Sequence, residues 1–120
     1  DAMPLAQAAL SAAIEVFGRT ASYTRDVLAA TSGWWIEQEK FDAAEAILHA
    51  DVEALLAAGG ESDAVTIEAM NALADLYDKR YEVEAREADA ALAAEWRERA
   101  AAGAVAASEG ASEPIQGVSP

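Results

Sequence analysis

The residue best suited to metal or acid–base chemistry is His49, the only histidine in the chain. Glu45 and Glu53 stand four residues before and after it, so on a helix the three side chains follow one face. A row of carboxylate, imidazole and carboxylate could hold a divalent metal, although di-iron bundles take Glu-x-x-His pairs from two helices and further glutamates. We therefore predict no metal and no cofactor. Glu45, His49 and Glu53 remain the candidates for an alternative function, a small metal- or cofactor-binding helical bundle.

Nothing else in the sequence singles out a catalytic group. Asp78 and Glu82 are carboxylates one helical turn apart, but on a polar helix face such a pair is usually just solvated charge. Met70, Tyr77 and Tyr81 could ligate haem, yet they recur at the spacing typical of a buried helix face. The chain has no cysteine, which excludes thiolate chemistry and cysteine-ligated metals. We predict that the protein is not an enzyme.

The net charge and the composition exclude several classes of binding partner. The net charge of −14 argues against nucleic acid and against anionic membrane surfaces. No apolar run approaches the roughly 20 residues that span a bilayer, so we predict no membrane insertion. More than a quarter of the residues are alanine, so large apolar side chains are few and the core is thin. Thin cores often gain stability from a partner, which favours an oligomer. The sequence does not indicate in which cellular compartment the protein is found.

The longest predicted element is one unbroken amphipathic helix from Asp63 to about Ala102. Neither proline nor glycine interrupts it, and its apolar positions alternate in steps of three and four. About 40 residues at 1.5 Å per residue give a rod of roughly 60 Å. The apolar positions are Ile67, Met70, Ala74, Tyr77, Tyr81, Ala85, Ala88, Leu92 and Trp96.

Two shorter helices are predicted before this rod, over about residues 4–31 and 34–58. Thr31-Ser32-Gly33 carries the residue types of a helix stop followed by a helix start. Gly18 lies inside the first apolar stripe, where glycine costs about 1 kcal/mol relative to alanine. We favour one helix there over a helix that bends or splits. This first helix is the least charged segment and the natural candidate for burial between neighbouring subunits.

The predicted fold class is all-α: a three-helix antiparallel bundle made of a helical hairpin plus one long C-terminal helix. Residues 1–102 form one helical domain. Residues 103–120 form a low-complexity tail that is disordered or held by a partner. No internal repeat is apparent.

The unequal helix lengths leave Leu92 and Trp96 beyond the end of the hairpin. A second subunit or another partner would cover them; alternatively, Trp34 or Trp35 packs on them within the chain, or the helix end frays. Tryptophan is enriched in binding hot spots. We predict a non-enzymatic structural, assembly or protein-interaction subunit, a homo-oligomer or part of a larger assembly, that binds through Trp34, Trp35, Leu92 and Trp96.

Overall fold

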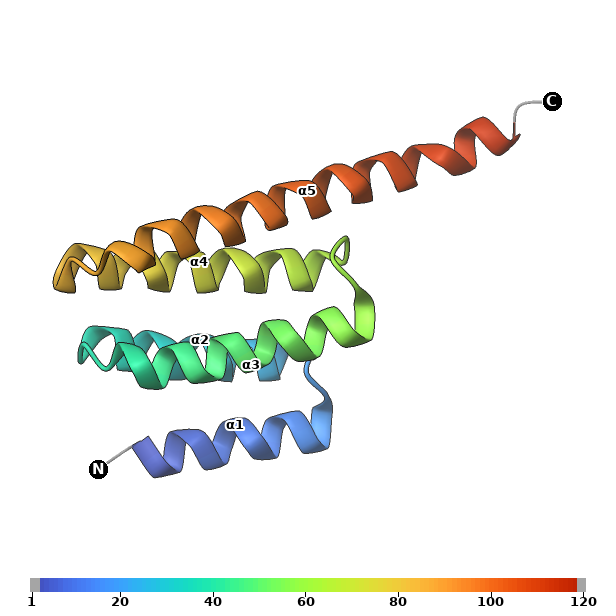
Figure 1. The fold of residues 1–120 in the computed structure, drawn as a ribbon. Helices are drawn as coiled ribbons and strands as arrows, with labels where there is room; N and C mark the ends of the chain where they lie inside the picture. The colour runs from blue at the N-terminus through green and yellow to red at the C-terminus, as the bar shows by residue number, and fades with distance from the viewer. Residues whose placement is uncertain (1–2, 119–120) are drawn as a thin grey trace. The chain divides into compact units, whose positions relative to one another are not determined.

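The computed structural model describes the backbone of residues 3–118 and the side chains of residues 6–109. The described residues form five helices and no strand, so the all-α class is confirmed and the count of three helices is wrong (Figure 1). The helices are α1 Met3–Phe17, α2 Ser22–Glu37, α3 Phe41–Gly59, α4 Ala64–Glu84 and α5 Glu87–Val118.

The chain divides into two compact units, Asp1–Asp51 and Val52–Pro120. The first unit contains α1, α2 and the first part of α3. The second contains the end of α3 together with α4 and α5. The predicted assignment of residues 1–102 to one domain stays a prediction.

The first predicted helix is split at Gly18. This glycine has a φ of +87° and its N–H donates to the carbonyl of Ile14 at 2.9 Å. The left-handed conformation ends α1, because a glycine without Cβ adopts it at little cost. α2 then packs against α1, and the Thr24 hydroxyl donates to the Ala13 carbonyl at 3.2 Å.

The predicted turn at Thr31-Ser32-Gly33 is wrong, because all three residues lie inside α2. Thr31 and Ser32 are buried, and the Ser32 hydroxyl donates to the Ala29 carbonyl of its own helix at 3.3 Å. The break comes instead at Glu39, which has a φ of +59°. The Lys40 N–H donates to the Trp35 carbonyl at 2.8 Å and closes this turn.

The predicted unbroken helix from Asp63 to Ala102 is also wrong. Ala85 adopts the left-handed conformation with a φ of +54°, and its N–H donates to the Tyr81 carbonyl at 2.8 Å. The chain reverses there, so α4 and α5 form an antiparallel hairpin (Figure 1). Arg80 donates to both carboxylate oxygens of buried Asp89, at 3.0 and 2.9 Å. Arg80 and Asp89 are nine residues apart in sequence, which in one straight helix would place them too far apart for an ion pair. The contact therefore joins two separate helices.

The predicted tail is helical in the structure, since α5 continues to Val118. Six of the nine residues from Ala100 to Ser108, where the tail begins, are alanine, the strongest helix former, which supports continued helix. Gly103 lets α5 pass close to the loop between α3 and α4, because a Cβ there would collide with the Glu61 carbonyl oxygen. Residues 119 and 120 lie outside the described residues.

The structure shows a repeat that the sequence did not. Gly60 follows Gly18 by 42 residues and has the same left-handed backbone, with a φ of +81°. Asp63, the N-cap of α4, follows Ala21, the N-cap of α2, by the same interval. The glycine turn and the helix start that follows it, at α2 and again at α4, are therefore repeated after 42 residues.

Burial follows the same 42-residue interval. Seven buried positions of α1 and α2 match seven buried positions of α3 and α4, and only the threonine pair keeps its residue type, which hid the repeat in the sequence. The pairs are Leu10 and Val52, Ala13 and Leu55, Thr24 and Thr66, Leu28 and Met70, Thr31 and Leu73, Ser32 and Ala74, and Trp35 and Tyr77.

Candidate functional site

The three candidate metal-ligating residues, Glu45, His49 and Glu53, all lie on α3. Among the described side chains, those of residues 6–109, no three His, Cys, Asp or Glu residues lie where they could hold a metal ion. Glu45 and His49 are half-buried on α3, and Glu53 is exposed. This row therefore carries no metal-site geometry.

Two of the four predicted interaction residues are buried in the structure. Trp35 on α2 and Trp96 on α5 are buried, while Trp34 and Leu92 are half-buried. Trp96 packs in the α4–α5 hairpin, and the Arg99 guanidinium lies over its ring at 4.5 Å. The overhang that would have exposed Leu92 and Trp96 is absent because the chain reverses at Ala85. Their role in binding stays a prediction without this geometric support.

A different surface exposes large apolar side chains. At the corner between α1 and α2, Val16, Phe17 and Tyr23 are 71%, 58% and 59% exposed. The rings of Phe17 and Tyr23 meet edge to face, with centroids 5.3 Å apart. Residues 16–25 are called the α1–α2 corner from here on. Aromatic side chains are enriched at binding surfaces, so this exposed pair is a candidate for one.

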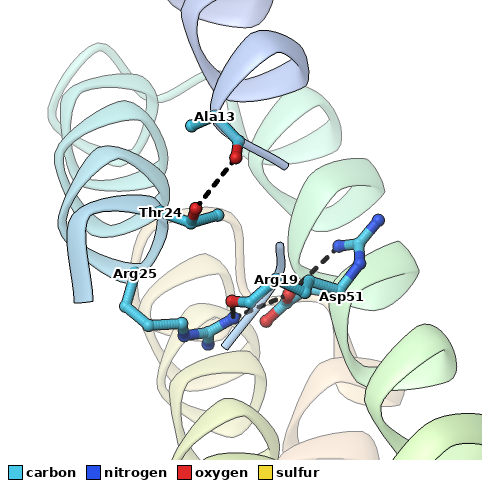
Figure 2. Close-up of polar contacts among 5 residues, drawn as sticks. All are labelled: Ala13, Arg19, Thr24, Arg25 and Asp51. Atoms are coloured by element: carbon cyan, nitrogen blue, oxygen red, sulfur yellow. Dashed lines mark hydrogen bonds and ion pairs between the residues drawn. The ribbon is translucent and has the colours of Figure 1, made fainter. Parts of the chain in front are cut away.

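A buried carboxylate anchors this corner. Asp51 on α3 is 1% exposed, and one of its oxygens, Oδ1, accepts from Arg19 Nη1 at 3.1 Å and from Arg25 Nη1 at 2.8 Å (Figure 2). Arg25 also lies 3.5 Å from the Arg19 carbonyl oxygen. Both guanidinium groups remain partly exposed. Asp51 thus ties the loop and the start of α2 to α3 within the first unit.

The outward side of α1 next to the corner carries almost no charge. Residues 2–14 contain no charged side chain, and Glu15 is the one charged residue of α1. Ala8, Ala12 and Val16 are exposed and stand four residues apart, so they form one ridge on the helix surface. These three residues are called the α1 ridge. The exposed side of α3, in contrast, carries Asp42 and Glu53.

Two arginines of α5 form ion pairs within the second unit. Arg97 on α5 forms ion pairs with Asp75 and Asp78 on α4, and these hydrogen bonds raise its pKa above the ordinary value. Arg99 pairs with Glu61 at 3.0 Å. These contacts hold the α4–α5 hairpin together, and none of them brings a nucleophile beside a base. Exposed ion pairs contribute less than about 1 kcal/mol each.

The comparisons with known proteins identify no relative: the chain matches no protein-family profile, no curated protein and no solved structure. Within the part of the chain that the structure describes, no helix is long and apolar enough to cross a membrane. The candidate site therefore rests on the geometry of the α1–α2 corner and the α1 ridge.

The sequence analysis favoured one continuous helix across Gly18 and so missed the corner. The signal was Gly18, which ends α1 immediately after Phe17. Once the helix ends there, the apolar face no longer continues onto a single neighbour and Phe17 is left at the surface. Asp51 gave no signal, because its arginine partners are 32 and 26 residues away in sequence.

Proposed function

We propose that the protein is a non-enzymatic assembly subunit that self-associates through the α1 ridge and the α1–α2 corner. The observation that carries this proposal is the exposure of Val16, Phe17 and Tyr23 beside an uncharged helix surface. Exposed apolar patches on a soluble protein mark interaction surfaces more often than chance.

The charge distribution supports a second copy as the partner. Two copies of a chain with a net charge of −14 repel each other, and repulsion is smallest where the contacting surfaces carry no charge. A basic partner would gain nothing from residues 2–14, since they offer no carboxylate. The acidic surfaces elsewhere keep the remaining faces of two copies apart.

The proposal is tested by sedimentation equilibrium of the full chain over a range of concentrations, at low and at high salt. We expect the average mass to rise with concentration from monomer toward dimer. Added salt should strengthen the association, because it screens the repulsion between the acidic copies. A complex held by opposite charges would weaken instead.

The matched variants replace two exposed apolar side chains each. The double change Val16→Ser with Phe17→Ser should lower the association constant at least about tenfold, which corresponds to about 1.4 kcal/mol. The change Tyr81→Ser with Val83→Ser removes two exposed side chains of α4 and should leave association unchanged. A wild-type chain that stays monomeric at every concentration and salt would overturn the proposal.

A further inference from the structure

We infer that the α4–α5 hairpin opens at Ala85 and exchanges α5 between two copies of the chain. In the exchanged dimer, α4 and α5 of each copy form one continuous helix, and α4 of one copy packs against α5 of the other. The structure itself shows what covers α4, because the exchange replaces the chain's own α5 by the identical α5 of a second copy (Figure 1). The surface is distinct from the α1–α2 corner, so this inference goes beyond the proposed function and does not depend on it.

The turn between α4 and α5 is short and strained. It consists of two residues, Ala85 and Arg86. Ala85 has a φ of +54°, a left-handed conformation in which the Cβ of an alanine crowds the backbone. Short hinge loops under strain favour exchange between copies. In the continuous helix Ala85 takes the ordinary helical conformation, so each chain loses this strain when the hairpin opens.

The sequence across the turn favours helix. Residues 84–88 read Glu-Ala-Arg-Glu-Ala, all of them strong helix formers. Their side chains are exposed, so turning this segment into helix removes none of them from a core. The end of α4 and the start of α5 leave backbone N–H and C=O groups without partners inside either helix, and a continuous helix pairs them. Local preference therefore supports the open form.

The contacts that hold the hairpin closed form equally well between two chains. The buried Arg80–Asp89 pair and the exposed Arg97–Asp75 pair each join a residue before Ala85 to one after it. Two open helices that lie antiparallel, with the two-fold axis at Ala85, bring each α4 residue of one copy beside its α5 partner on the other. Since a buried charge without its partner is costly, the Arg80–Asp89 pair selects this register.

The exchange differs in its kinetics from association through the α1–α2 corner. α5 must leave α4 before it can pack on a second copy, so the contacts of the hairpin break before they form again. The exchanged dimer therefore forms when the chain refolds at high protein concentration, and it dissociates slowly after dilution. Association of folded chains through an exposed surface needs no such rearrangement and follows dilution at once.

The absence of cysteine from the chain makes a direct test available, because introduced thiols have no competitors. The double change Asp75→Cys with Arg97→Cys places one thiol on α4 and one on α5, at an exposed ion pair. The full chain is refolded from urea at about 1 mM and at about 1 μM, and monomer and dimer are separated by size-exclusion chromatography. Each fraction is then treated with a short bismaleimide and run on a denaturing gel. We expect links between chains from the dimer and links within the chain from the monomer.

Ala85→Gly tests whether the turn controls the exchange. Glycine adopts the left-handed conformation at little cost and weakens a helix interior, so both effects favour the closed hairpin. The change acts once in each chain of the dimer, so the equilibrium constant for the exchanged dimer should fall at least about a hundredfold. Ala101→Gly makes the same change at an exposed position that is helical in both forms, and it should leave this constant unchanged.

Three results would overturn the inference. The first is a dimer whose thiols link only within each chain, which would leave association through the α1–α2 corner standing. The second is a chain that yields no slowly dissociating dimer after refolding at about 1 mM. The third is an equal fall in the dimer fraction for Ala85→Gly and Ala101→Gly, because the turn would then have no special part in the exchange.

Discussion

At the scale of single residues, Asp51 is the side chain on which the candidate site depends most. Its carboxylate is buried and holds two arginines of the α1–α2 corner on one oxygen, while its second oxygen, Oδ2, has no hydrogen-bond partner within the described part of the chain. A buried carboxylate is tolerated only when charges and donors compensate it. The position therefore constrains the corner more tightly than an apolar residue would.

Asp51→Asn should destabilise the first unit by about 2 kcal/mol, because it removes the charge that both guanidinium groups face. The partial exposure of Arg19 and Arg25 keeps the loss below that of a fully buried pair. Urea unfolding followed by circular dichroism measures the change. Asp26→Asn, at an exposed residue of α2, is the control and should stay within about 0.5 kcal/mol of wild type. Equal effects of the two substitutions would show that Asp51 does not anchor the corner.

At the scale of elements, the helix-forming character of the chain was predictable and two of the breaks between helices were not. Apolar spacing and alanine content identified helix almost everywhere. Glu39 and Ala85, where the chain leaves the helical conformation, are neither glycine nor proline, so no local signal marks them. Tertiary contacts decide these positions. The Arg80–Asp89 pair, for instance, forms only after the chain has reversed at Ala85.

Ala85→Gly should stabilise the α4–α5 hairpin by about 0.5 to 1 kcal/mol. A non-glycine residue in the left-handed conformation costs about 1 to 2 kcal/mol, and glycine removes this cost while adding some entropy to the unfolded chain. Thermal and urea unfolding measure the gain.

The control for Ala85→Gly is Ala101→Gly, at an exposed position within α5. There the same exchange should destabilise by about 1 kcal/mol, because the helix interior favours alanine. If both substitutions destabilise the protein equally, residue 85 lies within a continuous helix, as the sequence alone suggested.

In the candidate site, too, some features could be predicted from the local sequence and others depend on the tertiary structure. The low charge of α1 could be read directly from the sequence and made it a candidate for burial between subunits. The exposure of Phe17 and Tyr23 could not, since it depends on where α1 stops and on how α2 returns. Trp35 and Trp96 are large apolar side chains and are buried within the chain, while their role in binding stays a prediction.

At the scale of the whole molecule, 22 acidic residues against 8 basic ones dominate the electrostatics. Because acidic residues outnumber basic ones by 14, the net effect of these charges in the folded state is repulsion. We expect the free energy of unfolding to rise as sodium chloride is raised from about 0.02 to 0.5 M, since the Debye length then falls well below 10 Å. Chemical unfolding at low protein concentration tests this without interference from association.

A triple variant provides the control for the salt effect. Glu68→Gln, Glu82→Gln and Glu95→Gln neutralise three exposed carboxylates. This variant should be more stable than wild type at low salt and should gain less from added salt. A steeper salt response in the variant, or a wild-type chain that loses stability with salt, would mean that attraction within ion pairs outweighs repulsion.

The 42-residue register described for Gly18 and Gly60 has a consequence for how such a chain can originate. A segment that carries its own turn, helix start and buried positions can be duplicated in a gene without disturbing the pattern on either side. The two halves of such a chain can then diverge in residue type while the matched positions stay buried, as they do at Trp35 and Tyr77. A chain that arose in this way would keep the repeat in its backbone angles and burial for longer than in its residue types.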